Sequence, residues 1–265
     1  MRFVLFSMLA SLASLGAATS LGKDLDLTHT AVVSVSVDQP DRTGATGTLI
    51  SGRLVITAGH VSPAPGPGLP PWAVRIGPNA LQPAKTIRLD PATGSRPHPL
   101  FLSFVEQFGR HPMERLDFVD VGLLLLPEAA GIAPAALPSA GMLDHLARAD
   151  RFLGVGYGYH EAISPDEDRT GRASDGNRRQ WRLGVTVLNA AWIRLEDDPK
   201  KGYGQICGGD SGAPIFLERG GREILVGVVS HSEWAGCEAG IPTYAARVDN
   251  PVVLDWVRAA LHASE

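Results

Sequence analysis

The sequence predicts an all-β protein, folded as a sandwich or a barrel of short strands. The first observation is alternation, because Val33, Val35 and Val37 are separated by single serines, and a two-residue period is typical of a half-buried strand. The second is that the other apolar runs are short and are bounded by turn residues such as Gly, Pro, Asn and Asp. The third is that convincing helical spacing appears only near the C-terminus.

The expected elements follow one another closely. After the strand from Val33 to Val37, further strands are expected at residues 48–50, 54–57, 121–126, 152–157, 181–188, 214–217 and 224–229. Residues 219–222 read Arg-Gly-Gly-Arg, which predicts a hairpin turn between the last two strands. Residues 252–261 predict a helix, whose apolar face would carry Val253, Trp256, Val257 and Ala260.

Two longer loops interrupt this pattern. Ser62 to Pro83 is rich in Pro and Gly, and we expect it to be irregular. Ser164 to Arg179 is polar and contains the acidic residues Asp166, Glu167 and Asp168. Calcium binding is one interpretation of the acidic trio, but the ligand spacing of a known calcium loop is missing, so a solvated loop is the preferred one.

Composition narrows the class of protein. The chain has 265 residues, 44% of them hydrophobic and 20% charged, which suffices for one large core or two smaller ones. The formal net charge of −4 gives no sign of a broad basic face, so we expect neither nucleic acid nor an anionic membrane as a partner.

The N-terminus carries a targeting pattern. MRFVLFSMLASLASLGAATS has one Arg, an apolar run and then small residues, which is typical of a secretory signal peptide. A transmembrane anchor is the alternative, but the run is shorter than the roughly 20 residues that span a bilayer. We therefore expect export, to the cell exterior or to a periplasm. In an oxidising compartment the two cysteines, Cys207 and Cys237, can pair, and their spacing matches no short zinc or redox motif.

One segment has the composition of a catalytic loop. QICGGDSGAPIFLE, residues 205–218, places Ser211 between small residues that allow a sharp turn. A serine hydroxyl needs a base, and the base needs a third group that holds its tautomer. His60 directly follows an apolar strand, and Asp120 begins the apolar run DVGLLLL, where an entering carboxylate must find a partner.

In the order His, Asp, Ser, the segments GTLISGRLVITAGH, DVGLLLL and CGGDSGAP resemble the three signature segments of the chymotrypsin- and trypsin-like serine peptidases. VGYG at residues 155–158 is similar to the start of that family's second barrel, and GVVSHS resembles the strand lining its substrate cleft. The resemblance implies two six-stranded antiparallel β-barrels packed face to face, with a C-terminal helix. It divides the chain into a signal peptide at 1–20, an N-terminal barrel at 21–137 and a C-terminal barrel at 138–265. The Pro-, Ala- and Leu-rich composition of residues 126–137 indicates a connector between the two halves.

The resemblance also implies roles for single residues. Ser211 would be the nucleophile, His60 the general base and then acid, and Asp120 the group that orients the imidazole. The backbone N–H groups of Gly209 and Ser211 would form the oxyanion hole. Ser230 would support Asp120, and a disulfide between Cys207 and Cys237 would tie the nucleophile loop to the pocket wall. No metal or organic cofactor is implied, and the expected partners of this monomer are protein or peptide substrates.

The substrate pocket departs from the family pattern. Gln205 matches the base of the primary pocket, where trypsins have an aspartate, so cleavage after Arg or Lys is not implied. Ser230, His231 and Ser232 match the pocket wall, where His and Ser suit either an acidic side chain or, as we prefer, a polar one without charge preference.

A second departure concerns activation. Many family members are cut to expose a new terminal ammonium that pairs with the aspartate before the nucleophile, here Asp210. Lys23 is a candidate cleavage site, but the following DLDLTH does not match, so another partner for Asp210 is expected. The competing functions are a non-catalytic binding protein on the peptidase scaffold, and an exported esterase of the α/β-hydrolase type. The second needs a G-x-S-x-G elbow and the order Ser, acid, His, whereas this chain has the order His, Asp, Ser and is rich in predicted strands.

Overall fold

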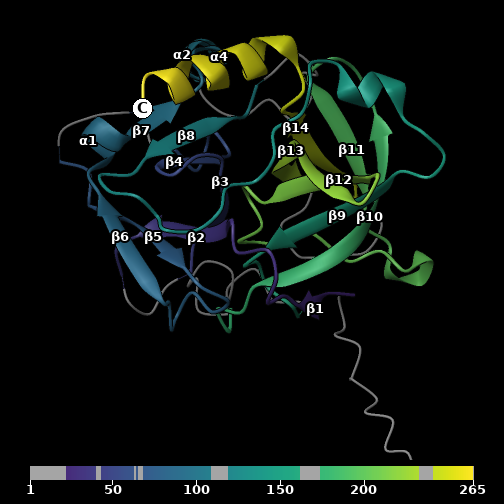
Figure 1. Ribbon diagram of the computed structural model, residues 1–265, viewed down its shortest axis with the longest axis horizontal. Helices are drawn as coiled ribbons and strands as arrows, with labels where there is room; N and C mark the ends of the chain where they lie inside the picture. Colours follow the sequence, from purple (N-terminus) through teal and green to yellow (C-terminus); the bar gives the residue numbers. More distant parts are fainter. Residues whose placement is uncertain are drawn as a thin grey trace, which may run out of the picture.

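The computed structural model describes residues 22–39, 43–62, 64, 68–108, 119–161, 174–232 and 241–264. Figure 1 shows two curled β-sheets side by side, one from the N-terminal half of the chain and one mainly from the C-terminal half. The C-terminal helix lies across the top of the molecule in this view. The expected signal peptide at 1–20 and the acidic trio at 166–168 lie outside the described residues.

The first sheet has seven strands in the order β6-β5-β2-β3-β4-β8-β7, each antiparallel to its neighbour. Its strands are β2 (Val32–Val37), β3 (Ala45–Leu49), β4 (Leu54–Thr57), β5 (Trp72–Ile76), β6 (Lys85–Leu89), β7 (Ser95–Pro97) and β8 (Gly122–Leu125). Within the described residues β6 and β7 remain at the two edges, so this sheet is a curled half-barrel. The expectation of an irregular loop at residues 62–83 is partly wrong, because this stretch contains β5.

The second sheet closes into a barrel. Its strands are β1 (Asp24–Leu25), β9 (Arg151–Gly156), β10 (Arg179–Val187), β11 (Trp192–Glu196), β12 (Pro214–Arg219), β13 (Arg222–Ser232) and β14 (Thr243–Arg247). β9 pairs with both β12 and β10, which closes a ring of six strands, and β1 is added outside at β10. The expected hairpin is confirmed: Arg219 pairs with Arg222, and the two intervening glycines have positive φ angles, as a tight turn requires.

The helices are few. Among the described residues they are α1 (Pro91–Gly94), α2 (Pro99–Phe108) and α4 (Pro251–His262), with 3-10 turns at Met142–His145 and Pro199–Lys201. α4 confirms the expected C-terminal helix, and it begins where the side chain of Asn250 accepts a hydrogen bond from the N–H of Val252. Helix α2 is not expected from the sequence. His98, just before α2, meets Trp256 of α4 edge-on, with ring centroids 4.7 Å apart.

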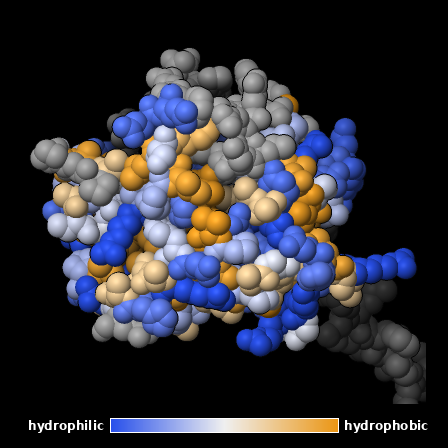
Figure 2. All heavy atoms as spheres, turned by 90° about the horizontal axis from the view of Figure 1, so that it is seen from above, coloured by the Kyte–Doolittle hydropathy of each residue, from blue (hydrophilic) through white to orange (hydrophobic). Residues whose placement is uncertain are grey.

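The main hydrophobic core is formed mostly by the half-barrel and extends to the closed barrel. It joins Val33 and Val35 of β2 to Val155 of β9 and Phe216 of β12, while a second cluster fills the interior of the closed barrel. The buried Tyr157 fastens the sheets together, because its hydroxyl donates to the carbonyl of Gly77 at 2.5 Å. Figure 2 shows hydrophobic residues interleaved with hydrophilic ones on the outer face seen from above. The fold class is confirmed, as a closed barrel beside a half-barrel; the domain boundaries at 20 and 137 stay predictions.

Candidate active site

His60 and Asp120 meet at one end of the first sheet. His60 lies in the turn after β4, and Asp120 lies two residues before β8, the strand that pairs with β4. The Nδ1 atom of His60 is 2.7 Å from Oδ2 of Asp120, and the backbone N–H of His60 donates to Oδ1 at 2.9 Å. Two contacts to one carboxylate fix both the position of the histidine backbone and the direction of its ring.

The electrostatics of this pair are those of a coupled base and carboxylate. Asp120 is completely buried, which by itself would raise its pKa, but the neighbouring His60 and the hydrogen-bond donors hold that pKa below the ordinary value. Burial by itself would lower the pKa of His60, but the negative charge of Asp120 raises it above 6.5. The carboxylate therefore stays ionised at neutral pH and favours the imidazolium form of its partner.

Ser230 joins this pair from the second sheet. Its hydroxyl donates to Oδ2 of Asp120 at 2.5 Å, and its oxygen lies 2.9 Å from Nδ1 of His231. Ser230 and His231 are neighbours near the end of β13, so the contact with Asp120 links the closed barrel to the half-barrel. The ring of His231 is held between Trp192 and Tyr244, with ring centroids 5.5 and 5.2 Å away.

The turn that carries Ser211 packs against the strand leading to His60. Gly212, the next residue, has a φ of +82°, and a Cβ atom there would lie 2.1 Å from the hydroxyl oxygen of Thr57 and 3.1 Å from the nitrogen of Ala58. Only glycine allows this approach. The carbonyl of Ser211 accepts the N–H of Thr46 at 2.9 Å. Contacts with β3 and with the end of β4 therefore hold the serine turn beside the loop that carries His60.

The same turn presents backbone donors. Among the described residues, the N–H groups of Gly209 and Ser211 donate to no protein acceptor, whereas the N–H of Asp210 between them donates to the carbonyl of Cys207 at 3.0 Å. Gly209 has a φ of +90°, and its carbonyl is tied to the hydroxyl of Thr46 at 2.9 Å. Two donors without internal partners on one tight turn are what an oxyanion hole needs.

The segment that carries Ser230 contacts this turn, because the carbonyl of Val229 accepts the N–H of Gly212 at 2.8 Å. Gln205 is buried, with 4% of its surface exposed, and its Nε2 atom has no hydrogen-bond partner among the described residues. Ser232, at the end of β13, pairs with Thr243 of β14. Cys207 is buried, but Cys237 lies outside the described residues, so the disulfide between them stays a prediction.

Sequence reasoning missed a buried carboxylate in the second sheet's half of the molecule. Asp197 follows β11 and is 3% exposed, with the N–H of Ile206 and the hydroxyl of Thr243 each 3.4 Å from its Oδ2. Burial raises its pKa to about 6. It borders a polar cavity of about 320 Å³ that is also lined by Arg194 and Lys201. In the sequence, Asp197 is the middle residue of a Glu-Asp-Asp run, which gives no sign of burial.

The second missed feature is the partner of Asp210. The side chain of Lys23 is completely buried and forms an ion pair with the Asp210 carboxylate. The sequence indicates that Asp210 needs a partner, but it presents Lys23 only as a candidate cleavage site. The surroundings of Lys23, including the ring of Trp181 at 4.4 Å from Nζ, are brought together by the fold alone.

A closed six-stranded barrel beside a half-barrel, with a His–Asp pair whose carboxylate is buried and a glycine-rich serine turn, defines the fold class of the two-barrel serine hydrolases. Comparison with known proteins makes this specific: the family model described as Trypsin matches residues 26–257. The chain belongs to the trypsin family.

Individual relatives match over a shorter stretch. Serine protease 1 and Serine protease 2 of Drosophila melanogaster are each 48% identical to the chain over 52 residues, which are 20% of this chain and 18% of theirs. The match thus spans less than a fifth of the length of either relative. In the part of the chain that the structure describes, no helix has the length and apolarity to cross a membrane.

Proposed function

We propose that the protein is a secreted serine endopeptidase that hydrolyses peptide bonds through an acyl-enzyme. The observation that carries the proposal is the contact of His60 Nδ1 with the buried Asp120 at 2.7 Å, reinforced by Ser230. This contact favours the tautomer that carries its proton on Nδ1, which leaves Nε2 to act as the base. Trypsin-family membership and the serine protease relatives support the same reaction class.

In the first half of the reaction, the Ser211 hydroxyl attacks the carbonyl carbon of the scissile peptide bond. A C–O bond forms, the hydroxyl proton passes to Nε2 of His60, and the carbonyl electrons move onto the oxygen. The ionised Asp120 stabilises the resulting imidazolium. As the tetrahedral intermediate collapses, the C–N bond breaks, and His60 returns the proton to the departing amine.

The N–H groups of Gly209 and Ser211 stabilise the negative oxygen of the intermediate. Each such donor contributes about 3–4 kcal/mol to lowering the barrier. In the second half, a water molecule gives a proton to His60 and attacks the acyl carbon, and the ester bond to Ser211 breaks as the proton returns to the serine oxygen. The products are a carboxylic acid, an amine and the regenerated enzyme.

Substrates would be proteins or peptides, with Gln205, Ser230, His231 and Ser232 around the primary pocket. Among the described residues, the unpaired Nε2 of buried Gln205 leaves a donor that a bound side chain or water can satisfy. We propose polar side chains as the preferred class. The signal-peptide pattern supports export, after which the protein would act as a monomer without a cofactor.

The test is labelling of the folded mature protein with a fluorophosphonate, which reacts with an activated serine. We expect one covalent adduct, located on Ser211 by mass spectrometry of the digested protein. Ser211→Ala and heat-denatured protein are the controls, and neither should be labelled. A peptide-library digest by the labelled species then gives the preference of the pocket.

The alternative, a non-catalytic binding protein, makes the opposite prediction. A protein that circular dichroism shows to be folded, and that neither reacts with the fluorophosphonate nor cleaves the library, would refute the peptidase assignment. An adduct that persists in Ser211→Ala would refute the choice of nucleophile.

A further inference from the structure

Lys23 is one of the most deeply buried charged residues of the described chain. None of its side chain is exposed, although lysine is almost never fully buried without a partner. Its Nζ pairs with the Asp210 carboxylate, donates to the carbonyl of Tyr159 at 3.1 Å and lies 4.4 Å from the ring centre of Trp181. Burial of an ammonium is costly, so this arrangement points to a specific role for its charge.

Asp210 connects the Lys23 ammonium to the serine turn through hydrogen bonds. One carboxylate oxygen accepts the N–H of Gly158 at 3.0 Å, and the other accepts the N–H of Cys207 at 2.9 Å together with Lys23. A Cβ atom at Gly158 would lie 2.4 Å from the carboxyl carbon, so this glycine makes room for the carboxylate. Asp210 therefore joins the start of the serine turn to the segment after β9, and in the chain it stands between the two residues whose N–H groups form the oxyanion hole.

The chain around Lys23 is held in place before and after it. Gly22 packs on Tyr203 and Gly204, where a Cβ atom would lie 3.1 Å from the Tyr203 carbonyl oxygen. The two residues after Lys23 form β1 and pair with Gln180 and Arg179 of β10. Lys23 is thus fixed by backbone contacts on both sides.

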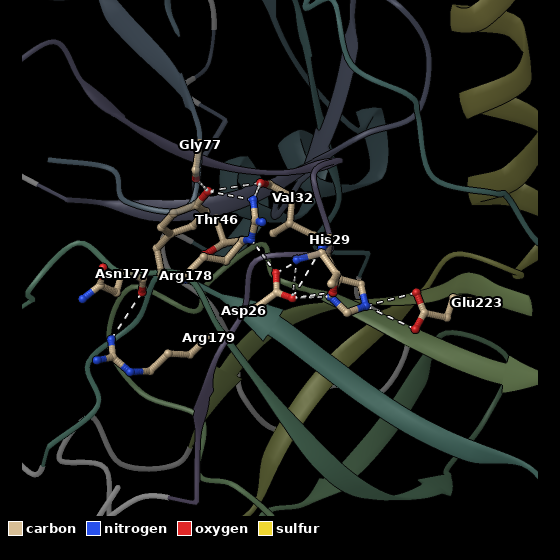
Figure 3. Close-up of polar contacts among 11 residues, drawn as sticks. Asp26, His29, Val32, Thr46, Gly77, Asn177, Arg178, Arg179 and Glu223 are labelled. Carbon is tan, nitrogen blue, oxygen red and sulfur yellow. Dashed lines mark hydrogen bonds and ion pairs between the residues drawn. The ribbon is translucent and has the colours of Figure 1, made fainter. Parts of the chain in front are cut away.

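A buried polar cluster anchors the next turn of the chain. Figure 3 shows the Asp26 carboxylate between the guanidinium of Arg178, at 2.6 Å, and the ring of His29, at 2.7 Å, with Glu223 on the other side of the ring. Arg178 also donates to the carbonyl of Val32 at 3.1 Å. These contacts fasten residues 26–32 to the barrel, so Lys23 is directed toward Asp210 by a fixed segment.

We propose that Lys23 is a positioning residue whose side-chain ammonium holds Asp210, so that the serine turn with the N–H groups of Gly209 and Ser211 is assembled without a newly cut N-terminus. The inference rests on the proposed function. It differs from the activation that the family resemblance implies, because the positive charge comes from a side chain within the chain. The α-amino group of the mature protein then has no part in the active site, whatever residue precedes Gly22.

The first arm of the test removes the charge. Lys23→Met keeps an unbranched apolar side chain of similar length, and Lys85→Met, at a half-exposed surface lysine paired with Glu128, is the matched control. We expect Lys23→Met to lower kcat about 10²–10³-fold, as loss of an oxyanion donor does, with a smaller change in KM. Lys85→Met should leave both within about twofold. In Lys23→Ala, added propylammonium should restore fluorophosphonate labelling with saturation, which a merely structural role would not allow.

The second arm leaves the folded sequence intact and so does not depend on the variants folding. Mature protein carrying an uncharged peptide extension before Gly22 is compared with protein whose α-amino group is free. Equal labelling rates support the proposal, and labelling that appears only after the extension is removed overturns it. Wild-type kinetics in folded Lys23→Met also overturn it. If the wild-type protein itself fails to label in both forms, with and without the extension, the failure lies with the proposed function.

Discussion

Replacing Asp197 with asparagine should stabilise the protein at neutral pH. Burial raises the pKa of Asp197 from 3.8 to about 6, so the folded state disfavours the charged form by roughly two pKa units. At 1.36 kcal/mol per unit, ionised Asp197 costs about 3 kcal/mol of folding free energy above pH 7. The side chain is 3% exposed, so solvent screens little of this.

The sign of the pH dependence follows from the raised pKa. The stability that protonated Asp197 contributes is fully present below pH 3.8, and it is lost as the pH rises through about 6. An asparagine side chain carries no charge at any pH, so the advantage of Asp197→Asn should be about 3 kcal/mol at pH 8 and about 1 kcal/mol at pH 4.5. The amide oxygen of the replacement can still accept from Ile206 and Thr243.

The assay is urea denaturation of wild type and Asp197→Asn at both pH values, followed by tryptophan fluorescence. For a chain of this size the gain at pH 8 corresponds to about 6–12 °C in Tm. Asp198→Asn, at the half-buried neighbour, is the control and should change stability little. An equal gain at pH 4.5 and pH 8, or a loss at pH 8, would refute the reasoning that a buried charge causes the cost.

Two further predictions concern the site. Because Asp120 raises the pKa of His60, kcat/KM should fall with decreasing pH, with an apparent pKa above 6.5. An apparent pKa below 6.5 in this pH profile would contradict the reasoning. Asp120→Asn should lower kcat by about 10⁴-fold with an unchanged circular dichroism spectrum. Gly158→Ala should abolish fluorophosphonate labelling, because its Cβ would collide with the Asp210 carboxylate, whereas Gly52→Ala, with no atom within 4 Å, should label like wild type. Normal labelling of Gly158→Ala would show that the Asp210 carboxylate can move without disrupting the turn that carries Ser211.

The strands that alternate or carry uniform apolar runs can be located from the sequence. The expected positions of β2 and β13 lie within a few residues of their observed bounds, because each strand has one or two buried faces. β5 (Trp72–Ile76) is missed because the sequence around it is rich in Pro, which predicts a loop. In the structure this segment pairs with β2 and β6. α2 is missed for another reason, since PLFLSFVEQF contains three phenylalanines and a valine, which fit a strand equally well.

Part of the candidate site can be predicted from the sequence. Three ordered motifs single out His60, Asp120 and Ser211, and the structure brings His60 and Asp120 into contact and sets the Ser211 turn against the strand before His60. Roles for these residues stay predictions until the labelling is done. Asp197 cannot be found in the same way, because its burial depends on β11 meeting β14 and the chain before Cys207, contacts that local sequence does not encode.

Lys23 shows most clearly what local sequence leaves out, and it limits where maturation can occur. A lysine followed by aspartate close to the predicted signal peptide has the composition of an exposed processing site, but its side chain is buried and β1 pairs with β10 immediately after it. A protease needs an extended, accessible segment, so the folded protein should resist cleavage at this bond. Cleavage before folding would separate the ammonium from β1 and leave Asp210 buried without its cation, which is strongly destabilising. Cleavage that preserves the serine turn therefore has to leave Lys23 on the chain, and a protein cut after Lys23 should be both less stable and unlabelled by a fluorophosphonate.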